Sequence, residues 1–247
     1  IWNTAKEEMD FLLEAKHMDR FAELNSGISY ITYPKVYHDL TTKHVLVMER
    51  IHGIPVDKVD KLKELGYDMN EIGQKLAENF VKQILDDAFF HADPHPGNIW
   101  IMDGKIAWLD FGMMGKLTGR DKELFRSAVT AIVNNDIYQL KNVFLTLGTA
   151  KQPIDHALLY TDVDEMVSRY GNLELGNMNL GVVFQEFMHV ANKHHILLPQ
   201  SVTMLGRGVM TIEGVLRFCA PDINLLQILA THMSNEFFRN FDWNKEL

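Results

Sequence analysis

The chain has 247 residues, of which 47% are hydrophobic and 23% are charged, and its formal net charge is −9. This composition is typical of a folded globular protein with one large domain or two small ones. The acidic balance excludes nucleic-acid binding through clustered lysine and arginine, so we expect no nucleic acid among the partners. The single cysteine, Cys219, excludes an internal disulfide and indicates a reducing, cytoplasmic environment.

No stretch approaches the roughly 18 uninterrupted apolar residues that a membrane span requires. The chain begins at Ile1 without a methionine, and no signal peptide is recognisable. We therefore expect a piece of a longer protein.

The first expected element is a helix that begins at a capping box of Thr4 and Glu7 and continues to about Leu24. Two short strands are expected next, over Tyr30–Val36 and His44–Glu49.

A second capping signature, Asp68 with Glu71, predicts a helix whose apolar periodicity continues to Phe90. Two short strands then follow, Ile99–Met102 and Lys105–Leu109. The Asp103-Gly104 pair between them is a strong signal for a two-residue hairpin turn.

From Gly119 onward the pattern is helical, with helices expected near 120–136, 137–147, 156–170, 180–195, 200–218 and 223–240. The chain is therefore predicted to be an α+β protein in which two mixed strands and one hairpin precede a helix-rich body. Gly214 inside one of these helices is expected to mark close helix packing, because glycine there costs about 1 kcal/mol relative to alanine.

The predicted hairpin carries the candidate chemistry. With Asp103 and Gly104 as the turn, Asn98 faces Leu109, so Asn98 and Asp110 meet at the open end. An amide oxygen and a carboxylate fixed side by side are suitable ligands for Mg²⁺ and leave further positions for water and phosphate oxygens.

Asp93 lies five residues before Asn98, in a loop stiffened by Pro94 and Pro96. Its carboxylate could accept a hydroxyl proton beside a metal-bound phosphate. The catalytic machinery of protein kinases uses the same order of residues: an aspartate, four further residues, an asparagine, a hairpin, and then Asp-Phe-Gly, here Asp110-Phe111-Gly112. Asp93 is in the position of the base. Gly112 is expected to permit the sharp turn out of the strand.

One alternative treats His91, Asp93 and His95 as ligands of a zinc hydrolase, since imidazole and carboxylate both bind zinc. The two prolines constrain that loop, and no further histidine-rich cluster follows at a useful spacing. We expect instead that His91 and His95 fix the loop backbone through hydrogen bonds.

The run from His91 to Asn98, together with Leu109-Asp110-Phe111-Gly112, resembles the signature of the UbiB family of atypical kinase-like proteins. The resemblance extends over essentially the whole chain. It implies a protein-kinase-like fold, binding of ATP and Mg²⁺, and a supporting role in ubiquinone and related isoprenoid-lipid metabolism. It divides the chain into a partial N-lobe, residues 1–52, and a helical C-lobe, residues 53–247.

The resemblance also assigns residues by position. Glu14 would pair with a phosphate-contacting lysine, Glu8 and Asp10 would face a family-specific N-terminal segment, and the hinge residues Glu49 and Ile51 would hold adenine. The nucleotide loop and that lysine precede this helix in the family and are absent from the 247 residues. We therefore expect this piece by itself to be inactive.

Two functions remain open from the sequence. One is an ATPase or a phosphotransferase acting on a small or lipid-related acceptor, and the other is a nucleotide-gated scaffold for a lipid-biosynthesis complex. In either case the expected partners are a nucleotide and an isoprenoid lipid or quinone precursor. An apolar, methionine-bearing helical surface could accommodate the isoprenoid tail, and the parent protein could associate peripherally with a membrane.

Overall fold

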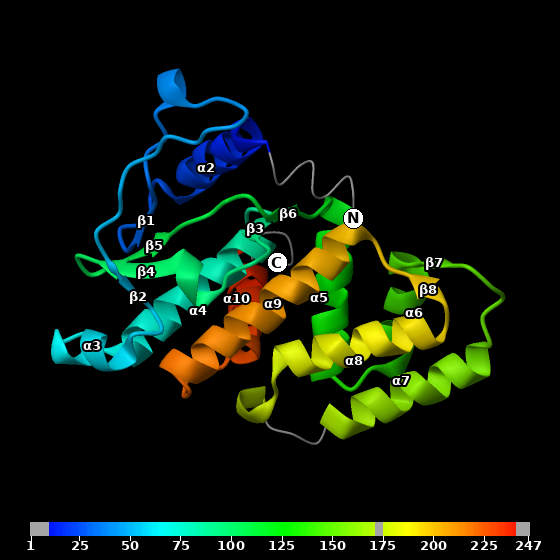
Figure 1. Ribbon diagram of the computed structural model, residues 1–247. Coiled ribbons are helices and arrows are strands. Elements are labelled where there is room, and N and C mark those ends of the chain that lie inside the picture. Colours follow the sequence, from blue (N-terminus) through cyan, green and yellow to red (C-terminus); the bar gives the residue numbers. More distant parts are fainter. Residues whose placement is uncertain (1–9, 171–174, 241–247) are drawn as a thin grey trace, which may run out of the picture.

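The computed structural model describes residues 10–170 and 175–240, in which a sheet-bearing region and a helical region share one hydrophobic core (Figure 1). The first region contains α2 (Phe11–Asn25), β1 (Ile31–Thr32), β2 (Ile54–Pro55), α3 (Val59–Glu64), α4 (Met69–Leu85), β3 (Phe89–His91), β4 (Ile99–Met102), β5 (Lys105–Trp108) and β6 (Met114–Lys116). The second contains α5 (Gly119–Val133), α6 (Ile137–Leu147), β7 (Thr149–Ala150), α7 (His156–Tyr170), α8 (Leu180–Lys193), β8 (Ile196–Leu197), α9 (Gln200–Cys219) and α10 (Leu225–Asn240). The α+β architecture is as expected.

The central sheet has the strand order β1-β5-β4-β2, and its middle pair is the predicted hairpin. Ile99 pairs with Trp108 and Met102 pairs with Lys105, which is the register expected from the sequence. Asp103 and Gly104 both have positive φ, 50° and 76°, as a two-residue turn matched to the twist of the strands requires. The open end of the hairpin therefore lies where the sequence predicts it.

The two strands expected before the hairpin are largely wrong. Only Ile31–Thr32 forms a strand, and it pairs in parallel with β5. The segment 44–49 forms no strand and makes only isolated bridges, Val45 with Thr42 and Met48 with Val36. Val45 and Met48 are exposed, at 52% and 39%, and only Leu46 of this segment packs against the core, so little apolar surface is available to hold a regular strand here.

The helix boundaries near the candidate site also differ from expectation. The expected capping box at Thr4 and Glu7 lies outside the described residues. The prediction of one helix that continues through residue 10 is wrong. Asp10 is non-helical (φ −105°, ψ 90°) and caps α2 by accepting a hydrogen bond from the Leu12 N–H.

The helix expected to reach Phe90 ends at Leu85, and Ala88 turns the chain with φ 51°. The strand β3 then pairs antiparallel with β6. A short apolar run such as Phe89-Phe90 fits either secondary structure, and only the partner strand decides between them.

The six helices expected after Gly119 are all present, with boundaries shifted by about three residues at most. One expectation is wrong, because a Cβ at Gly214 would meet nothing within 4 Å, so close packing does not explain that glycine. Within the described ranges no helix combines the length and the apolar character needed to cross a lipid bilayer.

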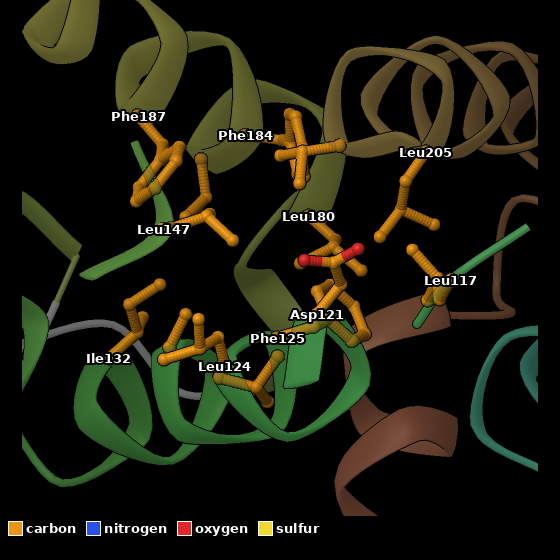
Figure 2. A pocket seen from close by; sticks show the side chains of 14 residues that line it. Leu117, Asp121, Leu124, Phe125, Ile132, Leu147, Leu180, Phe184, Phe187 and Leu205 are labelled. Atoms are coloured by element: carbon orange, nitrogen blue, oxygen red, sulfur yellow. The ribbon is translucent and has the colours of Figure 1, made fainter. Parts of the chain in front are cut away.

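A small apolar cavity of about 40 Å³ lies between α5, α8 and α9 (Figure 2). Leucine, valine and phenylalanine side chains line it, and the carboxylate of Asp121 is the charged group at its wall. That carboxylate accepts hydrogen bonds from the Thr118 N–H and the Ser201 hydroxyl, so its role is to cap α5.

Candidate active site

Asn98 and Asp110 lie at the open end of the hairpin. The Leu109 N–H donates to the Asn98 carbonyl at 2.9 Å, which fixes Leu109 opposite Asn98 and leaves Asp110 as the next residue along the chain. Asp110 follows directly and leaves the strand with φ 53°, a conformation that aspartate tolerates better than most residues. The left-handed turn therefore falls on Asp110, not on Gly112 as expected.

Asp93 is joined to this pair through the residues 91–98, which we call the candidate catalytic loop. The Asn98 side-chain amide donates to the Asp93 carbonyl at 3.2 Å. The His95 N–H donates to the same carbonyl at 2.8 Å, and the Gly97 N–H donates to His95 Nδ1. Internal hydrogen bonds thus fix the loop backbone and hold Asp93 close to Asn98.

His91 is fully buried and fixes the loop at its beginning. The Asp93 N–H donates to His91 Nδ1 at 3.2 Å, so the ring proton belongs on Nε2, which lies 3.2 Å from the Leu109 carbonyl. Burial lowers the pKa of His91, which keeps the ring neutral at pH 7. The backbone-fixing roles expected for His91 and His95 are confirmed.

The contacts of His91 also weaken the zinc alternative. Both ring nitrogens form hydrogen bonds to the backbone, so neither is left to bind a metal. In the part of the chain that the structure describes, no three side chains of histidine, cysteine, aspartate or glutamate come together as metal ligands.

The oxygen atoms at the end of the hairpin fit magnesium better than zinc. Asn98 Nδ2 donates to the Asp93 carbonyl, so Asn98 Oδ1 is the atom that remains for a metal. Asp110 Oδ1 accepts the Gly112 N–H at 3.1 Å, and Oδ2 remains for a metal. An amide oxygen and a carboxylate oxygen on neighbouring backbone positions are a suitable donor set for Mg²⁺, which favours a few protein oxygens together with phosphate and water.

Helix α2 contacts the candidate site at Phe111, the residue after Asp110. Glu14 Oε1 accepts the Phe111 N–H at 3.0 Å, and His17 Nδ1 lies 2.9 Å from the Phe111 carbonyl. Burial, and then the neighbouring Asp110 carboxylate, raise the pKa of Glu14, while the hydrogen bond from Phe111 opposes that rise. The structure therefore brings Glu14 beside Asp110, and its pairing with a lysine stays a prediction.

The other residues assigned by resemblance make their contacts elsewhere. Asp10 caps α2 and lies 4.0 Å from the Lys43 ammonium. Glu49 is exposed and accepts the Lys35 N–H, and Ile51 is half-buried. Glu8 lies outside the described residues. The nucleotide roles of these four residues stay predictions.

Arg207 is a site residue that was not predicted from the sequence. Its guanidinium donates to Asp93 Oδ2 at 3.2 Å from the middle of α9. A Cβ at Gly208 would lie 3.0 Å from the His91 carbonyl oxygen, so glycine there lets α9 approach the loop closely. The run Gly206-Arg207-Gly208 inside a helical pattern was the available signal, because two glycines are costly in a helix without a packing reason.

Two protein-family models match this chain. The model of the ABC1 atypical kinase-like domain matches residues 2–144, and that of the UbiB helical domain matches residues 163–224. The chain is 32% identical over 245 residues to an uncharacterized protein in the hydrogenase 1 5′ region of Clostridium pasteurianum, covering 98% of this chain and 46% of that protein.

The chain is also 30% identical over 229 residues to the chloroplastic protein ACTIVITY OF BC1 COMPLEX KINASE 1 of Arabidopsis thaliana, covering 92% of this chain and 34% of that protein. It therefore spans between a third and a half of the length of these two relatives.

Among solved structures, Rv3197 of Mycobacterium tuberculosis, determined in complex with erythromycin, superposes with a TM-score of 0.62 at 18% identity. The match covers 90% of this chain and 57% of that one. A likeness at this level of identity shows a shared fold. Since the ABC1 model covers more than half of the sequence, including the loop and the hairpin, the chain belongs to the ABC1 (UbiB) family of atypical kinase-like proteins.

Proposed function

We propose that this chain supplies the Mg²⁺-binding and catalytic residues of a longer ABC1 protein that binds ATP and carries out ATP hydrolysis or phosphoryl transfer to a small or lipid-related acceptor. The observation that carries the proposal is the arrangement at the hairpin end. Asn98 faces Leu109, the residue before Asp110, and the Asn98 amide donates to the Asp93 carbonyl.

In this proposal Asn98 and Asp110 hold the metal through their side-chain oxygens. A bound Mg²⁺ would supply charge neutralisation for the phosphate oxygens. Asp93 orients the attacking hydroxyl and accepts its proton. Arg207 orients the Asp93 carboxylate through their ion pair and places a positive charge beside the phosphoryl group, where negative charge has to be stabilised.

The proposed metabolic setting is ubiquinone or related isoprenoid-lipid metabolism, with an isoprenoid lipid or quinone precursor as partner and peripheral association of the parent protein with a membrane. Its support is the membership in the ABC1 family. The apolar cavity in Figure 2 adds little, because about 40 Å³ holds only a few carbon atoms and a prenyl tail would have to widen it.

The assignment of Asp110 as a metal ligand can be tested by removal of its negative charge. In the full-length protein that carries this chain, Asp110→Asn should abolish the thermal stabilisation that Mg·ATP gives the wild type. At a ligand concentration about 100 times Kd, that stabilisation is about 2.7 kcal/mol. Differential scanning fluorimetry with and without Mg·ATP measures it.

The matched control is Asp103→Asn at the opposite end of the same hairpin. Asp103 and Asp110 both have a φ close to 50°, which asparagine adopts easily, so the two variants change the same charge at similar backbone cost. Asp103→Asn should keep the full shift. A full shift in Asp110→Asn would refute the metal assignment, whereas a wild type that binds ATP without turnover would favour the scaffold function over the enzyme.

A further inference from the structure

Buried polar side chains form a line between the end of α2 and the candidate catalytic loop. Protein interiors tolerate such groups only when their hydrogen-bonding atoms are satisfied. Helix α4 supplies two of them, Asn79 and Gln83, which are one turn apart and fully buried. The line consists of Asn25, Asn79, Gln83, His91 and Asn98.

The orientation of the Asn79 amide is fixed by partners that cannot reverse their roles. The Trp108 indole N–H can only donate, and it donates to Asn79 Oδ1 at 3.0 Å. Asn79 Nδ2 therefore points the other way and donates to Asn25 Oδ1 at 2.8 Å. Asn25 Nδ2 in turn donates to the Phe21 carbonyl, which can only accept. One residue of α4 thus connects the end of α2 to strand β5.

Gln83 continues the line toward the loop, and the orientation of its side-chain amide is fixed in the same way. The His91 backbone N–H can only donate, and it donates to Gln83 Oε1 at 3.0 Å. Gln83 Nε2 then donates to Asn79 Oδ1 at 2.9 Å. We refer to Asn25, Asn79 and Gln83 as the amide relay.

The backbone at His91 determines where the catalytic groups lie. The His91 ring accepts the Asp93 N–H and contacts the Leu109 carbonyl, next to Asp110. A displacement of His91 therefore moves the candidate base and the metal-bearing strand end together. In enzymes, a displacement of about 1 Å can lower the rate by roughly 10²-fold.

Helix α2 consequently contacts the candidate site at two separate places. Near its N-terminal end, Glu14 and His17 contact the backbone of Phe111. At its C-terminal end, Asn25 enters the amide relay. A shift of α2 would act on the Phe111 segment directly and on the catalytic loop through the amides of α4.

We propose that Asn79 and Gln83 are positioning residues that couple the position of α2 to the geometry of the candidate catalytic loop. The relay stabilises one backbone arrangement at His91, because any other would leave buried donors without acceptors. The structural part of this inference stands on the contacts alone, and its consequence for turnover rests on the proposed function.

Gln83→Met tests the relay, since methionine has a similar length but provides no acceptor for the His91 N–H. Hydrogen–deuterium exchange at the amides of residues 91 and 93 in the full-length protein should become about 10-fold faster, because a buried donor loses its partner. Gln74→Met is the matched control on the same helix. Gln74 donates to Glu78 at the surface and has no hydrogen bond to the loop among the described residues, so exchange in the loop should stay unchanged.

Asn25→Ala tests the coupling itself, because Asn25 does not contact the loop. We expect faster exchange at His91 in this variant as well, and a double-mutant cycle with Gln83→Met should be non-additive. Should Gln83→Met be too unstable to purify, Asn79→Leu replaces it. That variant removes the acceptor of the Gln83 amide and should also speed exchange at His91.

The proposal is wrong if the loop amides of Gln83→Met exchange as slowly as those of the wild type. It is also wrong if Asn25→Ala changes exchange only within α2. If the wild type turns over ATP, Gln83→Met should lower kcat about 10-fold with little change in KM for ATP. Absence of turnover in the wild type would refute the enzymatic function alone, since the exchange experiment does not depend on it.

Discussion

His91 lies at the centre of the candidate site and is held neutral by its surroundings. Its Nδ1 accepts a backbone N–H, so a proton on that atom would break the contact with Asp93. Burial lowers its pKa for the same reason that it lowers the pKa of most buried cationic groups. The ring therefore acts as a structural support whose protonation state matters for stability.

This arrangement predicts a dependence of stability on pH. In the unfolded chain His91 titrates near pH 6.5, whereas in the folded chain its pKa is lower. Below about pH 6.5 the unfolded state therefore binds more protons, and the free energy of unfolding falls by up to about 1.4 kcal/mol per pH unit. Urea denaturation at pH 7.5 and pH 5.5 measures the loss.

His91→Asn isolates this contribution, because asparagine offers an acceptor near the position of Nδ1 but does not titrate. The variant should lose less stability than the wild type between the two pH values. An equal loss in both proteins would show that other groups control the acid sensitivity.

Arg207 is a second residue whose role follows from one contact. Arg207→Ala should lower ATP turnover of the full-length protein by about 10-fold to 100-fold, since it removes the cation that contacts the Asp93 carboxylate. The ion pair is half-exposed, so little change in the free energy of unfolding is expected. Arg217→Ala, on the same helix but outside the site, is the control, and equal turnover in the two variants would contradict the role of Arg207.

At the scale of elements, α8 is positioned by a carboxylate from its neighbour α9. Glu213 is buried and accepts the N–H groups of Leu180 and Gly181 at 2.7 and 2.6 Å. A Cβ at Gly181 would lie 2.8 Å from Glu213 Oε2, so glycine permits this approach. The carboxylate also complements the positive end of the helix dipole. The glutamate beside Gly214 thus has a structural role that its sequence context did not reveal.

Glu213→Ala should lower the free energy of unfolding by about 3 kcal/mol, because two N–H donors of α8 would be left buried without an acceptor. Chemical denaturation followed by circular dichroism measures this. Glu165→Ala, at an exposed position of α7, should change stability by less than about 0.5 kcal/mol. A loss in Glu213→Ala no larger than that of the control would contradict the capping role.

At the scale of the whole molecule, residues 10–52 are joined to the rest by core contacts. Strand β1 pairs with β5, and Phe21 is fully buried with its ring 4.9 Å from that of Phe111. Asn25 contacts Asn79 across the same boundary. The division at residues 52 and 53 is a prediction drawn from resemblance, and these contacts bear on whether the second part can fold alone.

A chain reduced to residues 53–247 should unfold at a lower denaturant concentration than the 247-residue chain. Burial of a side chain such as Phe21 or Met18 contributes about 1.5–3 kcal/mol each, and the relay would lose its partner on α2. Guanidinium denaturation of the two chains measures the difference. Equal midpoints would show that 53–247 is an independent folding unit.

Local sequence signals were sufficient for the features that depend on short-range physics. The Asp103-Gly104 turn set the hairpin register, and with it the neighbouring positions of Asn98 and Asp110. The helical periodicity after Gly119 gave the six helices with small errors at their ends. Both results rest on backbone preferences and apolar spacing within a few residues.

Tertiary structure alone decided the contacts between distant segments. Arg207 reaches Asp93 from 114 residues away, and the amides of α4 acquire their roles only when α2 and the loop lie on either side of them. Phe89–His91 became a strand because β6 was available to pair with it. A buried polar atom takes whichever partner the packed core brings to it, and that partner is not encoded in the residues beside it in the chain.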